Sequence, residues 1–255
     1  MSKKYKVLLV FLVLIVIFIS VLGIIGGIRF YKLSKIISAN KEKAELNNYI
    51  LRTKIKYNDK DSNVTAYYKD GVGKVVTSNG SYTWSDGTEA YYIDEETQTA
   101  YVLDINNSQS IAGYDMFMSM IPGYRKVLTR MKVALNIKNE ITTEKIGNKE
   151  YTVITIFDED AKKTIWVDND SKLVTKAVME FAAGTKVEYE YTVDFNKVNS
   201  INISKPSFSS YVLKSDISEI ETKVNEGIVS YITGENNGET VENSNTVSEV
   251  VNTAE

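Results

Sequence analysis

Two pairs of acidic residues are the first features of this sequence whose spacing could do chemistry. They share the D-x-D pattern that opens a calcium-binding loop: Asp158 with Asp160, and Asp168 with Asp170. An EF-hand loop also needs glycine at its sixth position, where these stretches have Lys163 and Leu173. Both pairs lie between expected strands, where Asp supplies hydrogen bonds to the backbone of a turn. We therefore interpret them as turn residues and predict no metal site.

Other catalytic groups are few. Histidine and cysteine are absent from the 255 residues, which excludes a Ser-His-Asp triad, a thiol nucleophile and a thiolate metal site. Gly71-Val-Gly73 is followed by Val76 instead of a third glycine, so it is not a dinucleotide-binding loop. Ser-Lys and paired-carboxylate catalysis stay open by composition, but no motif supports either. We predict a protein that is not an enzyme and needs no cofactor.

Binding through apolar side chains has more support. Four of the six methionines fall in one expected helical segment, from about residue 114 to residue 135, broken near Pro122-Gly123. The thioether chain is flexible and polarisable, and it suits surfaces that accept varied apolar ligands. The candidate binding residues of this segment are Met116, Phe117, Met118, Met120, Ile121 and Met131. The segment is expected either to plug a barrel, with Met filling irregular gaps, or to cover a cavity as a lid.

The elements that must position these residues are strands. Lys172–Phe181 and Thr185–Phe195 alternate apolar and polar residues with a period of two, which is typical of strands with one buried face. We expect Val174 on the outward face. The expected inward side chains are Ala177, Met179, Tyr189, Tyr191 and Val193, of which Met179, Tyr189 and Tyr191 complete the candidate ligand-binding set.

The turns between the strands indicate the fold class. Asp-Asn-Asp-Ser and similar short turns join strand-like segments between residues 49 and 103 and between residues 151 and 195. Connections this short produce antiparallel sheets with one buried and one solvated face. We predict an α+β fold that is mainly antiparallel β, preceded by a helix at about 29–48.

The N-terminal part predicts the cellular location. Val7 to Ile28 is a run of 22 residues without a charge, about 33 Å long as a helix and enough to cross a bilayer. Its length favours an uncleaved single-pass anchor over a signal peptide, with the body outside the cytoplasm of a bacterial cell. Gly23 and Gly27 have the spacing of a helix-pairing motif.

Charge and composition divide the remaining chain. Residues 216–255 hold nine acidic residues against Lys223 alone, so we expect this tail to be disordered. The body between the two ends is close to neutral, which gives no footprint for nucleic acid. The expected segments are a cytoplasmic end (1–6), a transmembrane helix (7–28), a juxtamembrane helix or stalk (29–48), a β domain (49–213) and an acidic tail (214–255).

One hairpin carries a family resemblance. Ser85-Asp86-Gly87-Thr88-Glu89-Ala90-Tyr91-Tyr92-Ile93-Asp94 resembles a hairpin of the LolA/LolB-like lipoprotein-carrier superfamily. Trp166-Val167-Asp168 with Leu173, and the strand that ends at Asp194-Phe195, resemble the later strands of that superfamily. The resemblance covers about residues 40–213. It implies a half-open antiparallel β barrel with a helical plug or lid, whose apolar concavity holds acyl chains or a hydrophobic segment of a partner.

Two functions follow as expectations from this resemblance. The first is a membrane-anchored extracytoplasmic binding protein that holds an acyl chain, a lipid or a lipoprotein. The alternative is an interaction or regulatory sensor domain that binds a partner polypeptide at the cell envelope. Carriers of this superfamily are usually released or lipid-anchored, whereas this chain has a predicted membrane helix and no cysteine for lipid attachment. Shuttling between two membranes is therefore not expected.

Overall fold

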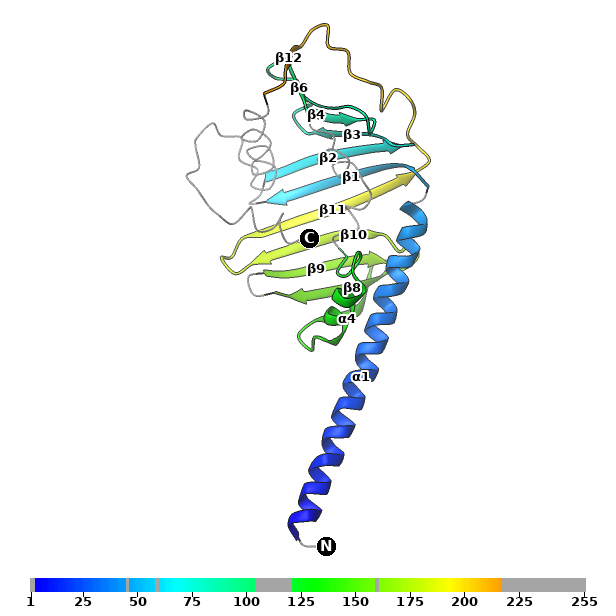
Figure 1. Ribbon diagram of the computed structural model, residues 1–255, viewed down its shortest axis with the longest axis vertical. Helices are drawn as coiled ribbons and strands as arrows, with labels where there is room; N and C mark the ends of the chain where they lie inside the picture. Colours follow the sequence, from blue (N-terminus) through cyan, green and yellow to red (C-terminus); the bar gives the residue numbers. More distant parts are fainter. Residues whose placement is uncertain (1–2, 45, 58–59, 104–120, 159–160, 217–255) are drawn as a thin grey trace.

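The computed structural model describes residues 3–44, 46–57, 60–103, 121–158 and 161–216 (Figure 1). These residues form two helices, α1 and α4, and one sheet of 12 strands. The helices are α1 (Lys3–Ala44) and α4 (Val127–Leu135). The strands are β1 (Asn48–Tyr57), β2 (Lys60–Lys69), β3 (Val72–Thr77), β4 (Tyr82–Ser85), β5 (Ala90–Asp94), β6 (Thr99–Val102), β7 (Glu140–Ile146), β8 (Lys149–Phe157), β9 (Ala161–Asp168), β10 (Val174–Phe181), β11 (Lys186–Phe195) and β12 (Val212–Lys214).

The sheet is open and almost wholly antiparallel. Its strand order is β12-β6-β5-β4-β3-β2-β1-β11-β10-β9-β8-β7, and β12 with β6 is its one parallel pair. Hairpins build β1 to β6 and β7 to β11, and the pairing of β1 with β11 joins the two sets into one surface. The mainly antiparallel sheet expected from the sequence is confirmed, and its two ends are not paired with each other, as in a half-open barrel.

The C-terminal part of α1 packs on this sheet. Leu33, Ile36 and Ile37 belong to the hydrophobic core, together with residues of β8, β9 and β10. The buried Asn40 amide donates hydrogen bonds to the carbonyl oxygens of Ile36 (2.8 Å) and Lys172 (2.6 Å), so it ties the helix to the turn between β9 and β10. This part of α1 therefore serves as the first helix of the β domain.

The ends of the chain are described only in part. Among the residues that the structure describes, no helix combines the length and the apolar character needed to cross a membrane. The side chains of residues 3–11 and 15–19 are not among those described, nor are residues 217–255. The membrane span expected over Val7–Ile28 and the disordered tail therefore stay predictions from the sequence.

The strand registers confirm the alternation expected from the sequence. Tyr191 is buried in the core, whereas its neighbour Glu190 is exposed. Opposite them, Thr53 pairs with Tyr191 and Lys54 with Glu190, so β1 and β11 alternate in step. The expectation for Val174 was wrong. The register of β10 against β9 shifts between Val174 and Lys176, and this bulge turns Val174 inward, where it is 1% exposed.

Two strands were not expected. β7 has the sequence EITTEKI, whose few apolar residues give little periodicity, and β12 has only three residues. Both gain their conformation from a neighbouring strand, β8 for β7 and β6 for β12. Both are also edge strands, so one side of each has no neighbouring strand among the described residues.

Candidate ligand-binding face

The candidate site is the inner face of the sheet, which we define as the face that packs on α1. Side chains that share this face alternate along each strand and oppose one another across neighbouring strands. One such row runs through Ile154 of β8, Ile165 of β9, Ala177 of β10, Tyr189 of β11 and Ile55 of β1. Every member is apolar or aromatic. The inner face is therefore apolar without interruption across these five strands at this row.

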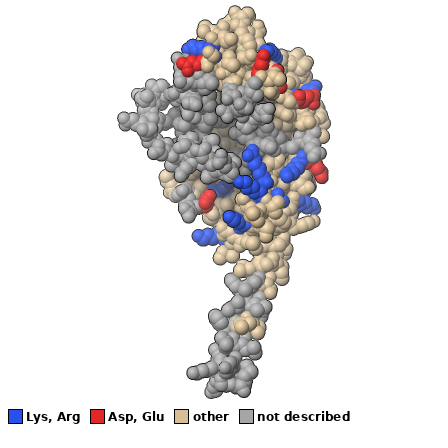
Figure 2. Space-filling model, in the orientation of Figure 1, with Lys and Arg blue, Asp and Glu red and all other residues tan. Residues whose placement is uncertain are grey.

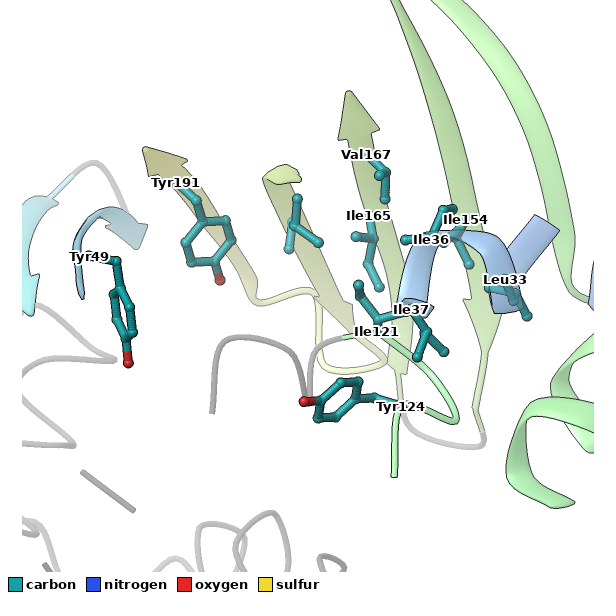
Figure 3. Close-up of a cluster of buried hydrophobic side chains, with 12 residues drawn as sticks. Leu33, Ile36, Ile37, Tyr49, Ile121, Tyr124, Ile154, Ile165, Val167 and Tyr191 are labelled. Carbon is teal, nitrogen blue, oxygen red and sulfur yellow. The ribbon is translucent and has the colours of Figure 1, made fainter. Parts of the chain in front are cut away.

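At the α1 end the inner face holds most of the buried residues of the core. Figure 3 shows Tyr49 and Tyr191 projecting from their strands to the same side as Ile165 and Val167, with Ile36, Ile37, Ile121 and Tyr124 across from them. Ile121 and Tyr124 belong to the segment between the two sets of hairpins. This end is the hydrophobic core of the domain.

The opposite end of the inner face is only partly buried. The next row consists of Ile156, Lys163, Met179, Val187 and Tyr57, in the order β8, β9, β10, β11 and β1. Ile156, Lys163, Met179 and Tyr57 are partly exposed. We call this set the apolar row. Three apolar side chains of this row, those of Ile156, Met179 and Tyr57, retain access to solvent.

Lys163 lies in the middle of the apolar row. It is the one charged residue at an inner-face position of β1, β9, β10 and β11, and it is opposed by Ile156 and Met179. No hydrogen bond or ion pair joins it to another described residue. Burial lowers the pKa of the Lys163 ammonium group to about 8, because the loss of water disfavours the charged form. An unpaired cation in this place is costly unless it binds something.

Several tyrosines also lie on the inner face. The rings of Tyr49 and Tyr68 stack with centroids 5.2 Å apart, and those of Tyr189 and Tyr191 stack at 6.2 Å. Burial raises the pKa of the Tyr189 hydroxyl, so this group stays a neutral hydrogen-bonding group at physiological pH. Tyrosine offers a large apolar body with a polar end, which suits contact with amphiphilic molecules.

The outer face has the opposite character. Ion pairs cross it between neighbouring strands: Lys176 with Glu188 at 3.0 Å, Lys162 with Glu180 at 3.0 Å, and Arg52 with Asp194. Hydrogen bonds from Lys186 and Lys176 lower the pKa of Glu188 to about 2. These ion pairs lie on the solvated face, whereas Lys163 lies on the inner face without an ion pair to a described residue.

The structure places the predicted site residues in three groups. Met179, Tyr189 and Tyr191 lie on the inner face, and Ile121 lies in the core beside them. Met131 lies apart on α4, where it is exposed. Met116, Phe117, Met118 and Met120 fall outside the described residues. Lys163 was missed, although the alternation of Ile165 and Val167 places it on the same face two residues earlier.

The acidic residues of the turns have structural contacts. One carboxylate oxygen of Asp168 accepts hydrogen bonds from the backbone N–H of Asp170 (3.0 Å) and of Ser171 (2.7 Å). In the Ser85–Asp94 hairpin, one carboxylate oxygen of Asp86 accepts hydrogen bonds from the backbone N–H groups of Thr88 and Glu89. These carboxylates hold turns, as the sequence predicted for Asp168. Asp160 is outside the described residues.

Comparisons with known proteins give similarity in structure alone. No protein-family model matches the chain, and no curated protein matches it. An uncharacterized conserved protein from Thermus thermophilus is similar with a TM-score of 0.46 and 8% identity, over 71% of this chain and 99% of that one. The MucA/MucB complex of Pseudomonas aeruginosa is similar with a TM-score of 0.42 and 10% identity, over 71% of this chain and 63% of that one.

A LolA superfamily protein from Nitrosomonas europaea is also among the similar structures. Its TM-score is 0.28 and its identity 12%, over 66% of this chain and 96% of that one. This chain spans less than two thirds of the chain from the MucA/MucB complex, so the comparison leaves much of that protein unmatched. The structures similar to this chain thus include a protein of the superfamily that its Ser85–Asp94 hairpin resembles.

Proposed function

We propose that this protein is a membrane-anchored binding protein of the bacterial cell envelope that holds an amphiphile by its apolar chain. The ligand lies against the apolar row, and Lys163 pairs with its negatively charged group. The 22-residue uncharged run supports the anchor. The resemblance to lipoprotein carriers, read from the sequence, supports a ligand with an acyl chain. The proposal assigns binding and no chemical reaction.

The observation that carries this proposal is Lys163, which forms no ion pair with a residue that the structure describes. Ligand sites are mostly apolar, with a few placed polar groups that fix the orientation of the ligand. An apolar row that encloses one cation matches a ligand with one anionic group and a long apolar part. From β9 to β1 the row spans three strand spacings, about 14 Å, which leaves room for an extended chain beyond the charged group.

The chemistry of the lysine favours a carboxylate or a phosphodiester. An ammonium group is a compact charge with three donors, and it balances one negative charge. No second cation shares the inner face of β1, β9, β10 and β11, so a group with two negative charges would be left unbalanced. A fatty acid and the head group of an anionic lipid both meet this requirement.

Photo-crosslinking in membranes tests the proposal. The full chain in vesicles is exposed to a fatty acid that carries a photoreactive group near its chain end, and the crosslinked peptides are mapped. We expect crosslinks in β10 and β11, reduced about tenfold by Met179→Asp because a charge then lies in the apolar row. Glu180→Asp is the matched control, since it changes the adjacent outward residue and should leave the crosslinks intact.

The outcomes separate the ligand from the anchor. Crosslinks confined to α1 would mean that the fatty acid only contacts the membrane span, and the proposed function would be wrong. The methyl ester of the same fatty acid tests Lys163, because it keeps the chain and removes the charge. It should compete poorly with the acid in the wild-type chain and equally well in Lys163→Met.

A partner polypeptide is the second candidate, and β7 is the observation that favours it. β7 ends the sheet with exposed side chains and pairs only with β8 among the described strands. An open edge can accept an extended peptide as a further strand. Crosslinking from Thr143 on β7 would recover this partner, whereas crosslinks from β10 and β11 to lipid alone would exclude it.

A further inference from the structure

The surface around α4 has an apolar stripe that is largely exposed, and only its Leu135 end touches α1 in the described structure. Leu128 is 73% exposed, Met131 45% and Leu135 53%, and their spacing places them on one side of the helix. Ile137, directly after the helix, is 72% exposed. Val133 lies on the opposite side and packs against the core, and Ala134, between the two sides, is buried. The helix therefore has a packed side and an apolar side that is largely exposed to solvent.

Contacts between α4 and α1 show where this stripe lies along the axis of α1. Arg130 donates a hydrogen bond to the hydroxyl of Ser34 (3.0 Å), and Arg29 donates one to the carbonyl oxygen of Asn136 (3.2 Å). Leu135 lies against Gly26, where an added methyl group would be 2.5 Å from its Cδ2 atom. The C-terminal end of α4 is therefore level with Gly26 and Arg29 of α1.

The C-terminal end of α4 thus lies beside the last residues of the uncharged run Val7–Ile28. Gly26 precedes Ile28 by two residues, or about 3 Å of helix. If the run spans the bilayer, Leu135 and Ile137 then lie at the boundary between hydrocarbon and head groups. Figure 1 shows α4 at the end of the domain from which the N-terminal part of α1 extends. The exposed Tyr31 lies one turn beyond Ile28, where aromatic residues gather at membrane surfaces.

The charges around the stripe have one sign. Residues 121–139 contain five basic residues and no acidic one: Arg125, Lys126, Arg130, Lys132 and Lys138. Figure 2 shows Lys and Arg gathered on the lower half of the domain, with few acidic residues among them. Lys126 stands at the N-cap of α4, where no side chain caps the helix and a positive charge is unfavourable. Anionic head groups would complement the exposed charges of Arg125, Lys126, Lys132 and Lys138, whereas Arg130 is held by Gly123 and Ser34.

We propose that α4 and Ile137 dock on the surface of an anionic bilayer, the same bilayer that holds α1. Met131, Leu135 and Ile137 enter the boundary of the hydrocarbon, and the basic residues lie among the head groups. Helices with apolar and basic sides bind membranes in this way. The docking fixes the domain at the membrane with the sheet above it. This inference rests on the membrane anchor of the proposed function and is independent of the ligand.

Site-directed labelling tests the docking. The chain has no cysteine, so single-cysteine variants carry one spin label each without further changes. The variants are Met131→Cys and Ile137→Cys, with Thr143→Cys on the exposed part of β7 as the aqueous control and Leu14→Cys as the control for the anchor. The full chain is placed in nanodiscs that contain phosphatidylglycerol, and the access of oxygen and of a polar nickel complex is compared.

We expect labels at residues 131 and 137 to meet oxygen more than nickel, as the label at residue 14 does, and the label at residue 143 to show the reverse. If residue 14 is in lipid while residues 131 and 137 match residue 143, the docking is refuted and the anchor stands. If residue 14 is itself in water, both the anchor and the docking are refuted.

Discussion

Lys163 is the residue on which the proposed function depends, and its burial should make the stability of the protein depend on pH. Its pKa is about 8 in the folded protein, below the ordinary value of 10.5, because burial disfavours the charged form. Between these two values the unfolded chain holds a proton that the folded chain has lost. The free energy of unfolding therefore rises as pH increases from about 8 to 10.5. Below pH 8 the destabilisation caused by the buried charge is present in full.

We predict that Lys163→Met stabilises the ligand-free chain at pH 7 by up to roughly 3 kcal/mol, and that its advantage shrinks toward pH 10. Urea unfolding of the full chain in mild detergent measures this. The quantity to compare is the difference between wild type and variant at each pH, because ionising tyrosines affect both alike. An advantage that does not change with pH would show that Lys163 is hydrated in the folded protein.

At the scale of the strand, the register of β11 decides which side chains can meet a ligand. Tyr191 is buried and belongs to the core, and Glu190 is exposed on the outer face. We predict that Tyr191→Asp lowers the free energy of unfolding by about 3 kcal/mol, since it buries an unpaired charge. Glu190→Asp should change it by less than about 0.5 kcal/mol. Equal effects in urea unfolding would mean that β11 is displaced by one residue.

Local patterns of the sequence were sufficient for most strands. Short turns and a period of two placed β8 to β11 within a few residues, and they gave the inward side of Met179, Tyr189 and Tyr191. The bulge that turns Val174 inward was not predictable, because it arises from the pairing of β10 with β9. β7 was missed for a related reason: its sequence has little periodicity, and β8 supplies the hydrogen-bonding partner.

The whole molecule depends on contacts between distant parts of the chain. β1 pairs with β11 although more than 100 residues separate Tyr49 from Phe195, and α1 packs over strands that come late in the sequence. No local pattern encodes which strands join two sets of hairpins. The same limit applies to the site. Lys163 becomes a candidate binding residue only because strand pairing places Ile156 and Met179, which carry no charge, on either side of it.

Mass spectrometry of the intact protein tests the central claim most directly. The full chain is purified from its own membranes in mild detergent, and the mass of each complex is compared with that of the bare polypeptide. We predict one bound amphiphile with a single negative charge, lost from Met179→Asp and retained by Glu180→Asp. A wild-type chain that carries no amphiphile, while a polypeptide partner crosslinks to its inner face, would contradict the proposed function.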